Sequence, residues 1–131
     1  MDVDISTPQA EPFMVNDERQ RRLAAGSAFA VAGIVDPIPL QGLPFDQTVY
    51  IALLTRAGGL KSAGVTTPAL TLRDAADTIH ELTPDQIISL VSQAMTWFES
   101  VMAVSWAMKD GIAPFEAGIP LDYTDDVYWP T

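Results

Sequence analysis

The residues with the clearest chemical potential lie in LRDAADTIH, residues 72–80, which holds two aspartates and the chain's single histidine. Two carboxylates in different environments can serve as acid and base, and histidine is the commonest general base near neutral pH. Here Asp74 and Asp77 flank an Ala-Ala pair between two alternating segments, and turns favour Asp at such places. We therefore interpret both acids as residues of a hairpin turn. We expect His80, on the returning strand, to face solvent or cap a neighbour.

A second acidic cluster lies near the C-terminus in DYTDD, where Asp122, Asp125 and Asp126 are close in sequence. Carboxylates at this spacing can bind a hard cation such as calcium. The segment has neither the central glycine nor the distal glutamate of an EF-hand loop, and clusters of acids are usually solvated. We predict no metal site.

The other candidate groups lack the context that catalysis or phosphate binding requires. Ser27, Ser89 and Ser105 have no nucleophile-elbow sequence around them, and Gly58-Gly59 is not part of a phosphate-binding loop. The chain has no cysteine, which excludes thiol catalysis and thiolate metal sites. We expect the arginines at 19, 21 and 22 to pair with the protein's own acids. The sequence thus predicts no enzyme, no catalytic residue and no cofactor.

The charge balance narrows the possible partners. The 131 residues carry a net charge of −10, whereas a nucleic-acid-binding surface needs clustered Lys and Arg. Met1 is followed by acidic and polar residues, so we expect no signal peptide. The longest apolar stretch, Ile87 to Met108, contains Glu99 and several serines, which argues against a membrane span. We predict neither nucleic acid nor membrane as a partner.

Two strand pairs and three helices are expected to hold these groups in place. Residues 1–15 have no period and predict an extended arm, and Asn16 is a candidate cap for a helix that ends at Gly26. The expected order is then two short strands in SAFAVAGI and IPLQG, a helix over about 44–60, and strands in LTLR and TIHEL. Two such β-β-α units would share one small antiparallel sheet, so the fold class is α+β.

The strongest local signal is the segment from Thr83 to Lys109. Thr83 with Gln86 three residues later forms a capping box, Pro84 occupies the first helical position, and Gly111 follows the end. We predict one continuous helix of about 40 Å, the longest element. The resulting organisation is an arm over residues 1–15, an α+β domain over 16–111 and an extended arm over 112–131.

The long helix is apolar around most of its circumference, so one small sheet cannot cover it. The other helices and the tail could enclose it, or a second face could pack on another subunit, where Trp and Met are enriched. The C-terminal aromatics raise the same question, and we expect that arm to dock on a neighbour. The interface candidates are Trp97, Val101, Met102, Trp106, Met108, Tyr123, Tyr128 and Trp129.

Several motifs resemble an uncharacterised domain family found in bacteriophage tail and tail-fibre genes. They are RLAAGSAFAVAGI, LRDAADTIHELTPDQ running into the long helix, and the terminal IPLDYTDDVYWP. The resemblance covers about residues 18–130, and its most specific part is LRDAADTIHELTPDQ. It implies a structural or assembly role in the virion, with other tail proteins and copies of the chain as partners. The family offers no catalytic residues to carry over.

Three functions therefore remain open at the level of sequence. The first is a virion structural protein of the tail, tail fibre or baseplate, made in the bacterial cytoplasm. The second is an assembly chaperone absent from the particle. The third is a small-ligand or carbohydrate-binding module that uses Trp106 or Trp129 as a stacking platform.

Overall fold

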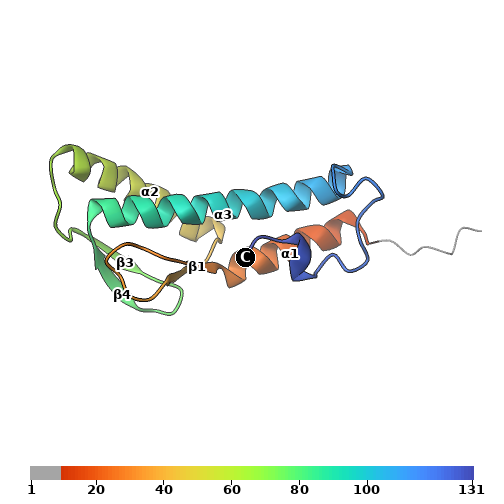
Figure 1. Ribbon diagram of the computed structural model, residues 1–131, viewed down its shortest axis with the longest axis horizontal. Helices are drawn as coiled ribbons and strands as arrows, with labels where there is room; N and C mark the ends of the chain where they lie inside the picture. Colours follow the sequence, from red (N-terminus) through yellow and green to blue (C-terminus); the bar gives the residue numbers. More distant parts are fainter. Residues whose placement is uncertain (1–9) are drawn as a thin grey trace, which may run out of the picture. The chain divides into compact units, whose positions relative to one another are not determined.

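The computed structural model describes residues 10–131 and contains three α-helices and two small sheets. The elements are α1 (Pro12–Ala25), β1 (Ser27–Phe29), β2 (Ile38–Leu40), α2 (Pro44–Ser62), β3 (Leu70–Arg73), β4 (Ile79–Leu82), α3 (Pro84–Asp110) and the 3-10 helix η1 (Asp126–Tyr128). This confirms the α+β class (Figure 1). The described residues group into two compact units, residues 23–98 and residues 10–22 with 99–131. Here they are called the central unit and the terminal unit.

The helix α3 runs without interruption through 27 residues, as predicted. Thr83 Oγ1 accepts a hydrogen bond from Gln86 N–H at 3.1 Å, and Gln86 Oε1 accepts one from Thr83 N–H at 2.9 Å. This reciprocal pair satisfies two of the donors that a helix start leaves free. Within the described residues, α3 is the one helix long and apolar enough to cross a membrane by length and composition alone, a test that core helices also pass.

In the central unit, β1, the loop after it and α2 contact the first part of α3. Phe29 meets Trp97 edge to face at 6.5 Å between ring centroids, and Tyr50 stacks on Phe98 at 6.3 Å. In Figure 1, α2 crosses this part of α3. Gln93 Nε2 also donates to the carbonyl of Ala30 at 2.9 Å, which fixes the loop after β1. Aromatic pairs thus join β1 and α2 to α3 in the core of this unit.

The two hairpins form two separate two-stranded sheets, where the sequence led us to expect one shared sheet. The strand β1 pairs with β2, and β3 pairs with β4, each antiparallel. One backbone hydrogen bond joins the hairpins, from Ala75 N–H to Pro39 C=O at 2.9 Å. Pro39 lies in the middle of β2 and has no N–H to donate, so it cannot extend a ladder to a further strand.

The predicted N-terminal arm needs correction. Residues 1–9 lie outside the described part of the chain, but α1 begins at Pro12, four residues before the expected cap. Proline is well suited to the first helical position, and Val15 is fully buried, which gives this turn a packing role. Asn16 does not act as a cap, because its Oδ1 accepts a hydrogen bond from Lys109 Nζ at 2.8 Å.

The C-terminal segment is also not extended. Residues 111–130 form successive turns and the 3-10 helix η1, whose first free N–H, that of Val127, donates to Asp125 Oδ1 at 3.0 Å. The tail returns to its own unit through the contacts described below. Short Asp-centred turns therefore replace the predicted straight arm.

Gly26 offers a test of how α1 connects to β1. Its φ is +73°, and a Cβ there would overlap the carbonyl oxygen of Leu40. We expect Gly26→Ala to lower the free energy of unfolding by about 2 kcal/mol or more, from backbone strain and the clash. Gly59→Ala is the matched control, because Gly59 lies within α2 with open space around its Cα. The control should gain up to about 1 kcal/mol. Urea denaturation of both variants measures this difference, and equal stabilities would contradict the assigned turn.

Candidate functional site

Asp74 and His80 form a close pair at the end of the β3–β4 hairpin. The register pairs Leu72 with His80, so the turn that starts at Asp74 returns the histidine toward it. His80 Nε2 lies 2.7 Å from Asp74 Oδ2. The other carboxylate oxygen accepts hydrogen bonds from the N–H groups of Ala76 and Thr78 at 2.8 and 3.0 Å. The side chain of Asp74 is 4% exposed, so this carboxylate is held inside the turn.

Two opposing effects act on the pKa of Asp74. Burial raises it, whereas hydrogen bonds from His80, Thr78 and Ala76 lower it, and the net pKa lies below the ordinary aspartate value. The charged form of Asp74 is therefore favoured by folding. A pocket of about 360 Å³ adjoins the pair, lined by Ile34, Val35, Asp36, Pro37, Pro39, Asp74, Ala76, Thr78 and His80.

The pair acts as a brace for the hairpin. Both oxygens of Asp74 already accept hydrogen bonds from the turn, and within the described residues no group of three His, Asp or Glu side chains is arranged to hold a metal. Besides Asp74 and His80, the pocket lining includes the polar side chains of Asp36 and Thr78. Sequence reasoning placed Asp74 in the turn correctly, but it did not foresee its pairing with His80. The signal was the spacing of six residues across a tight antiparallel turn.

A second polar cluster joins α1 to the C-terminal segment within the terminal unit. Glu18 is buried and accepts hydrogen bonds from Arg21 and Arg22 at 2.5–2.8 Å. Burial raises the pKa of Glu18, but the hydrogen bonds and positive charges of Arg21 and Arg22 lower it by more than burial raises it. The net pKa of Glu18 therefore lies below the usual value. Arg22 also donates to the carbonyl of Thr124 at 2.7 Å and to Asp126 Oδ1 at 2.8 Å. The expected pairing of these arginines with the protein's own acids is present for Arg21 and Arg22.

The terminal aromatics pack on this cluster. The guanidinium of Arg22 lies over the Trp129 ring, 5.1 Å from its centroid, and Trp129 Nε1 donates to the carbonyl of Tyr123 at 2.7 Å. Tyr128 contacts Phe115 edge to face, and its hydroxyl donates to Asp122 Oδ1 at 2.7 Å. Trp129 is 4% exposed. The expectation that Trp129 docks on a neighbouring subunit is therefore corrected, since its own unit already covers it.

The acidic cluster DYTDD has structural partners. Asp122 accepts from Tyr128, Asp125 caps η1, and Asp126 pairs with Arg22. Each carboxylate thus organises the turn that holds Trp129. This is an alternative to cation binding that the sequence reasoning did not consider.

The predicted interface residues separate into two groups. The buried ones, which lie in the core of their own units, are Trp97, Val101, Met108 and Trp129. Those that keep surface are Met102, Trp106, Tyr123 and Tyr128. Of these, Trp106 is 51% exposed on α3. The four candidates that keep exposed surface all belong to the terminal unit.

The terminal unit contains an apolar groove, whose lining residues on α3 precede and follow Trp106 in the sequence. It has a volume of about 290 Å³, and α3 contributes Ala103, Val104 and Ala107 to it. The C-terminal segment supplies the remaining lining residues, which are Ala113, Pro114, Phe115, Val127 and Tyr128. Val127 is 77% exposed at its edge. Small side chains on the helix leave this groove open.

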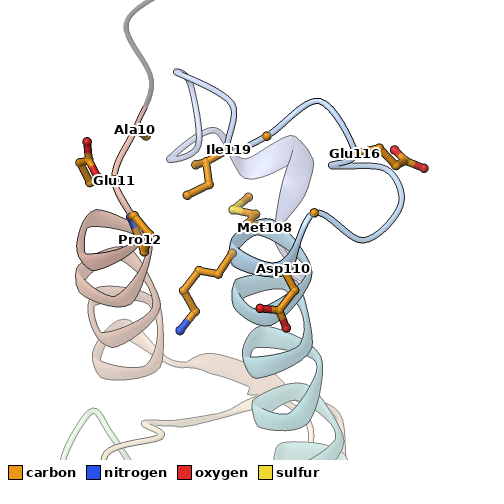
Figure 2. Close-up of a pocket in the computed structure, with 10 residues that line it drawn as sticks. Ala10, Glu11, Pro12, Met108, Asp110, Glu116 and Ile119 are labelled. Atoms are coloured by element: carbon orange, nitrogen blue, oxygen red, sulfur yellow. The ribbon is translucent and has the colours of Figure 1, made fainter.

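A further hollow of about 400 Å³ lies where α1 begins and α3 ends (Figure 2). Met108 and Ile119 point toward each other inside it, whereas Glu11 and Glu116 point away from its centre (Figure 2). The acids therefore form an outer rim and do not converge on a ligand.

A family model described as Domain of unknown function (DUF4376) matches residues 8–127. The chain belongs to this family. The matched range of the DUF4376 chain includes the hairpin with Asp74 and His80, the whole of α3 and both Glu18 and Arg22. It ends just before Tyr128 and Trp129. No curated protein and no solved structure matches the chain.

The Asp74–His80 pair predicts a specific response to acid. Because the pKa of Asp74 is lowered in the folded state, its stabilising effect is present above the unfolded value and is lost as pH falls through the folded one. We expect stability to decrease from about pH 5 downward. In Asp74→Asn this decrease should be smaller, with Glu18 accounting for part of what remains.

Urea denaturation at several pH values between 7 and 3 measures this effect. Asp77→Asn is the matched control, because its carboxylate is exposed and lies 3.8 Å from Arg73. The control should keep the pH dependence of the unaltered protein. Identical slopes for Asp74→Asn and the unaltered protein would contradict the assigned role of Asp74.

Trp129 predicts that the C-terminus stabilises its own chain. Trp129→Ala removes a buried indole, its hydrogen bond to Tyr123 and its contact with Arg22, and should cost about 3–5 kcal/mol. Val127→Ala, two residues earlier and exposed, should change stability by less than about 0.5 kcal/mol. Chemical denaturation distinguishes the two. A Trp129→Ala protein as stable as Val127→Ala would contradict the packing of Trp129 on its own chain.

Proposed function

We propose that this DUF4376 chain is a non-catalytic structural subunit of a bacteriophage virion, in the tail, tail fibre or baseplate. Its partners are other tail proteins and copies of itself. The observation that carries the proposal is the apolar groove of the terminal unit, with Trp106 and Val127 exposed. Contiguous exposed apolar surface on a folded protein is typical of interaction sites.

The composition of this surface supports protein binding more than small-molecule binding. Trp and Tyr are enriched at energetic centres of protein interfaces, and Trp106 and Tyr128 lie on the same unit. Trp129, one of two candidate platforms for a sugar ring, is covered by Arg22. The polar groups that would fix a ligand's orientation are few along the groove, where Tyr128 is the one lining residue with a polar side-chain atom.

The assignment to a phage tail rests on the resemblance of the motifs LRDAADTIHELTPDQ and IPLDYTDDVYWP to a family found in tail and tail-fibre genes. The contacts of these motifs support a scaffolding role. In the first, Asp74 and His80 brace a hairpin, and Thr83 with Gln86 starts α3. In the second, the terminal tryptophan is held by its own unit. Both motifs are engaged in holding the fold.

A second candidate is an assembly chaperone that shields a tail protein and then leaves. The net charge of −10 together with an open apolar groove favours it, because an acidic surface keeps such a protein soluble while its groove is empty. The two candidates differ in whether the chain remains in the mature particle.

Quantitative mass spectrometry of purified virions separates these functions. We expect the chain in gradient-purified particles of the phage that encodes it, in a fixed ratio to the major tail proteins. Absence from particles, combined with tail defects when its gene is deleted, would instead support the chaperone. Normal infectious particles without the gene would contradict both. A Trp106→Ser chain should be incorporated less than a Val35→Asp control, whose site in the central unit is 97% exposed.

A further inference from the structure

We infer that the groove of the terminal unit binds a basic amphipathic segment of a partner tail protein. Apolar side chains of that segment enter the groove, and its Lys or Arg side chains pair with acids beside it. This inference rests on the proposed assembly function and specifies the chemistry of the partner.

The exposed face of α3 supports this arrangement. Positions three and four apart lie on one helix face, and Glu99, Ala103, Trp106, Ala107 and Asp110 follow that spacing. All of them are exposed except Ala107, which is half-buried in the groove. The apolar residues thus occupy the middle of the stripe, and one carboxylate lies at each end.

The charge of the terminal unit is one-sided. Its described residues, 10–22 and 99–131, include nine Asp and Glu but four Lys and Arg. All four basic side chains bond within the unit: Arg19 to Ser105, Arg21 and Arg22 to Glu18, and Lys109 to Asn16. Each basic side chain of the described part of this unit therefore already has a hydrogen-bond partner within the unit.

Several carboxylates remain free to meet a partner. Among the described residues, the side-chain carboxylates of Glu99 and Asp110 on α3 make no hydrogen bond or ion pair, and the same holds for those of Glu11 and Glu116, which line the separate hollow in Figure 2. Electrostatic complementarity then selects a positively charged occupant. A second copy offering the same face would place like charges together, which disfavours it as the occupant of this groove.

A synthetic helix-forming peptide of leucine and lysine, about 18 residues long with its leucines on one face, is a suitable probe. Three matched controls accompany it: the same residues in scrambled order, and two versions with glutamate or glutamine in place of lysine. Fluorescence anisotropy with the full-length protein measures the affinity of each. We expect the ordered Leu/Lys peptide to bind tightest, and its affinity to fall as salt rises.

Val127→Asp distinguishes docking in the groove from general attraction between opposite charges. The added carboxylate would strengthen a purely electrostatic encounter, but it places a charge at the edge of the apolar groove. We expect the Leu/Lys peptide to bind about tenfold more weakly or worse. Val35→Asp adds the same charge at an exposed site of the central unit and should not weaken binding. Glu99→Gln with Asp110→Asn should weaken it roughly two- to fivefold.

Three results would overturn the inference. The first is equal or tighter peptide binding by Val127→Asp relative to Val35→Asp, with both variants shown to be folded by circular dichroism. The second is a dimer of the unaltered protein in sedimentation that Val127→Asp dissolves, because a second copy would then fill the groove. The third is co-flotation of the unaltered protein with phosphatidylcholine vesicles that Val127→Asp abolishes, because a lipid surface would then be what the groove binds. The virion assay tests the proposed function independently. If the chain is present in particles but does not bind the Leu/Lys peptide, the inference about the groove is wrong and the proposed function stands.

Discussion

Burial of side chains of α3 is the constraint on which each unit depends. Fully buried positions include Ile87, Leu90 and Ala94 in the central unit and Val101, Ser105 and Met108 in the terminal unit, and within each unit they follow the three- and four-residue spacing of one helix face. Each large apolar side chain removed from water there contributes roughly 1.5–3 kcal/mol. The helix supplies core residues first to the central unit and then, beyond Phe98, to the terminal unit. Its uninterrupted register is therefore a condition for packing in both.

The terminal unit shows how an acidic chain can retain aromatic residues near its end. Glu18 is shared by two arginines, so one carboxylate leaves a surplus of positive charge beside it. Arg22 directs that surplus toward Asp126 and the face of Trp129. A guanidinium suits this role because its planar donors reach several oxygens while its face rests on a ring. The tail is thus held by charge and aromatic contacts together.

The sequence predicted well what is encoded locally. The capping box and the absence of internal Gly or Pro identified α3, and turn residues identified both hairpins. It failed where distant residues decide the outcome. Arg22 meets Asp126 across 104 positions and Asn16 meets Lys109 across 93, and no periodicity encodes such pairs. The early start of α1 has the same cause, since burial of Val15 overrides the better cap at Asn16.

The interface candidates show the same limit in another form. Hydrophobicity alone selected eight residues on α3 and the tail, yet four of them fill the chain's own core. The buried and exposed candidates differ in which face of α3 they occupy and in where the C-terminal segment packs. Both depend on the folded structure. Val101 and Met108 lie on the inward stripe, whereas Trp106 lies on the outward one between Glu99 and Asp110. A large aromatic kept exposed between two carboxylates carries a solvation cost that the fold itself does not recover. Contact with a partner that brings apolar and basic groups together would recover it.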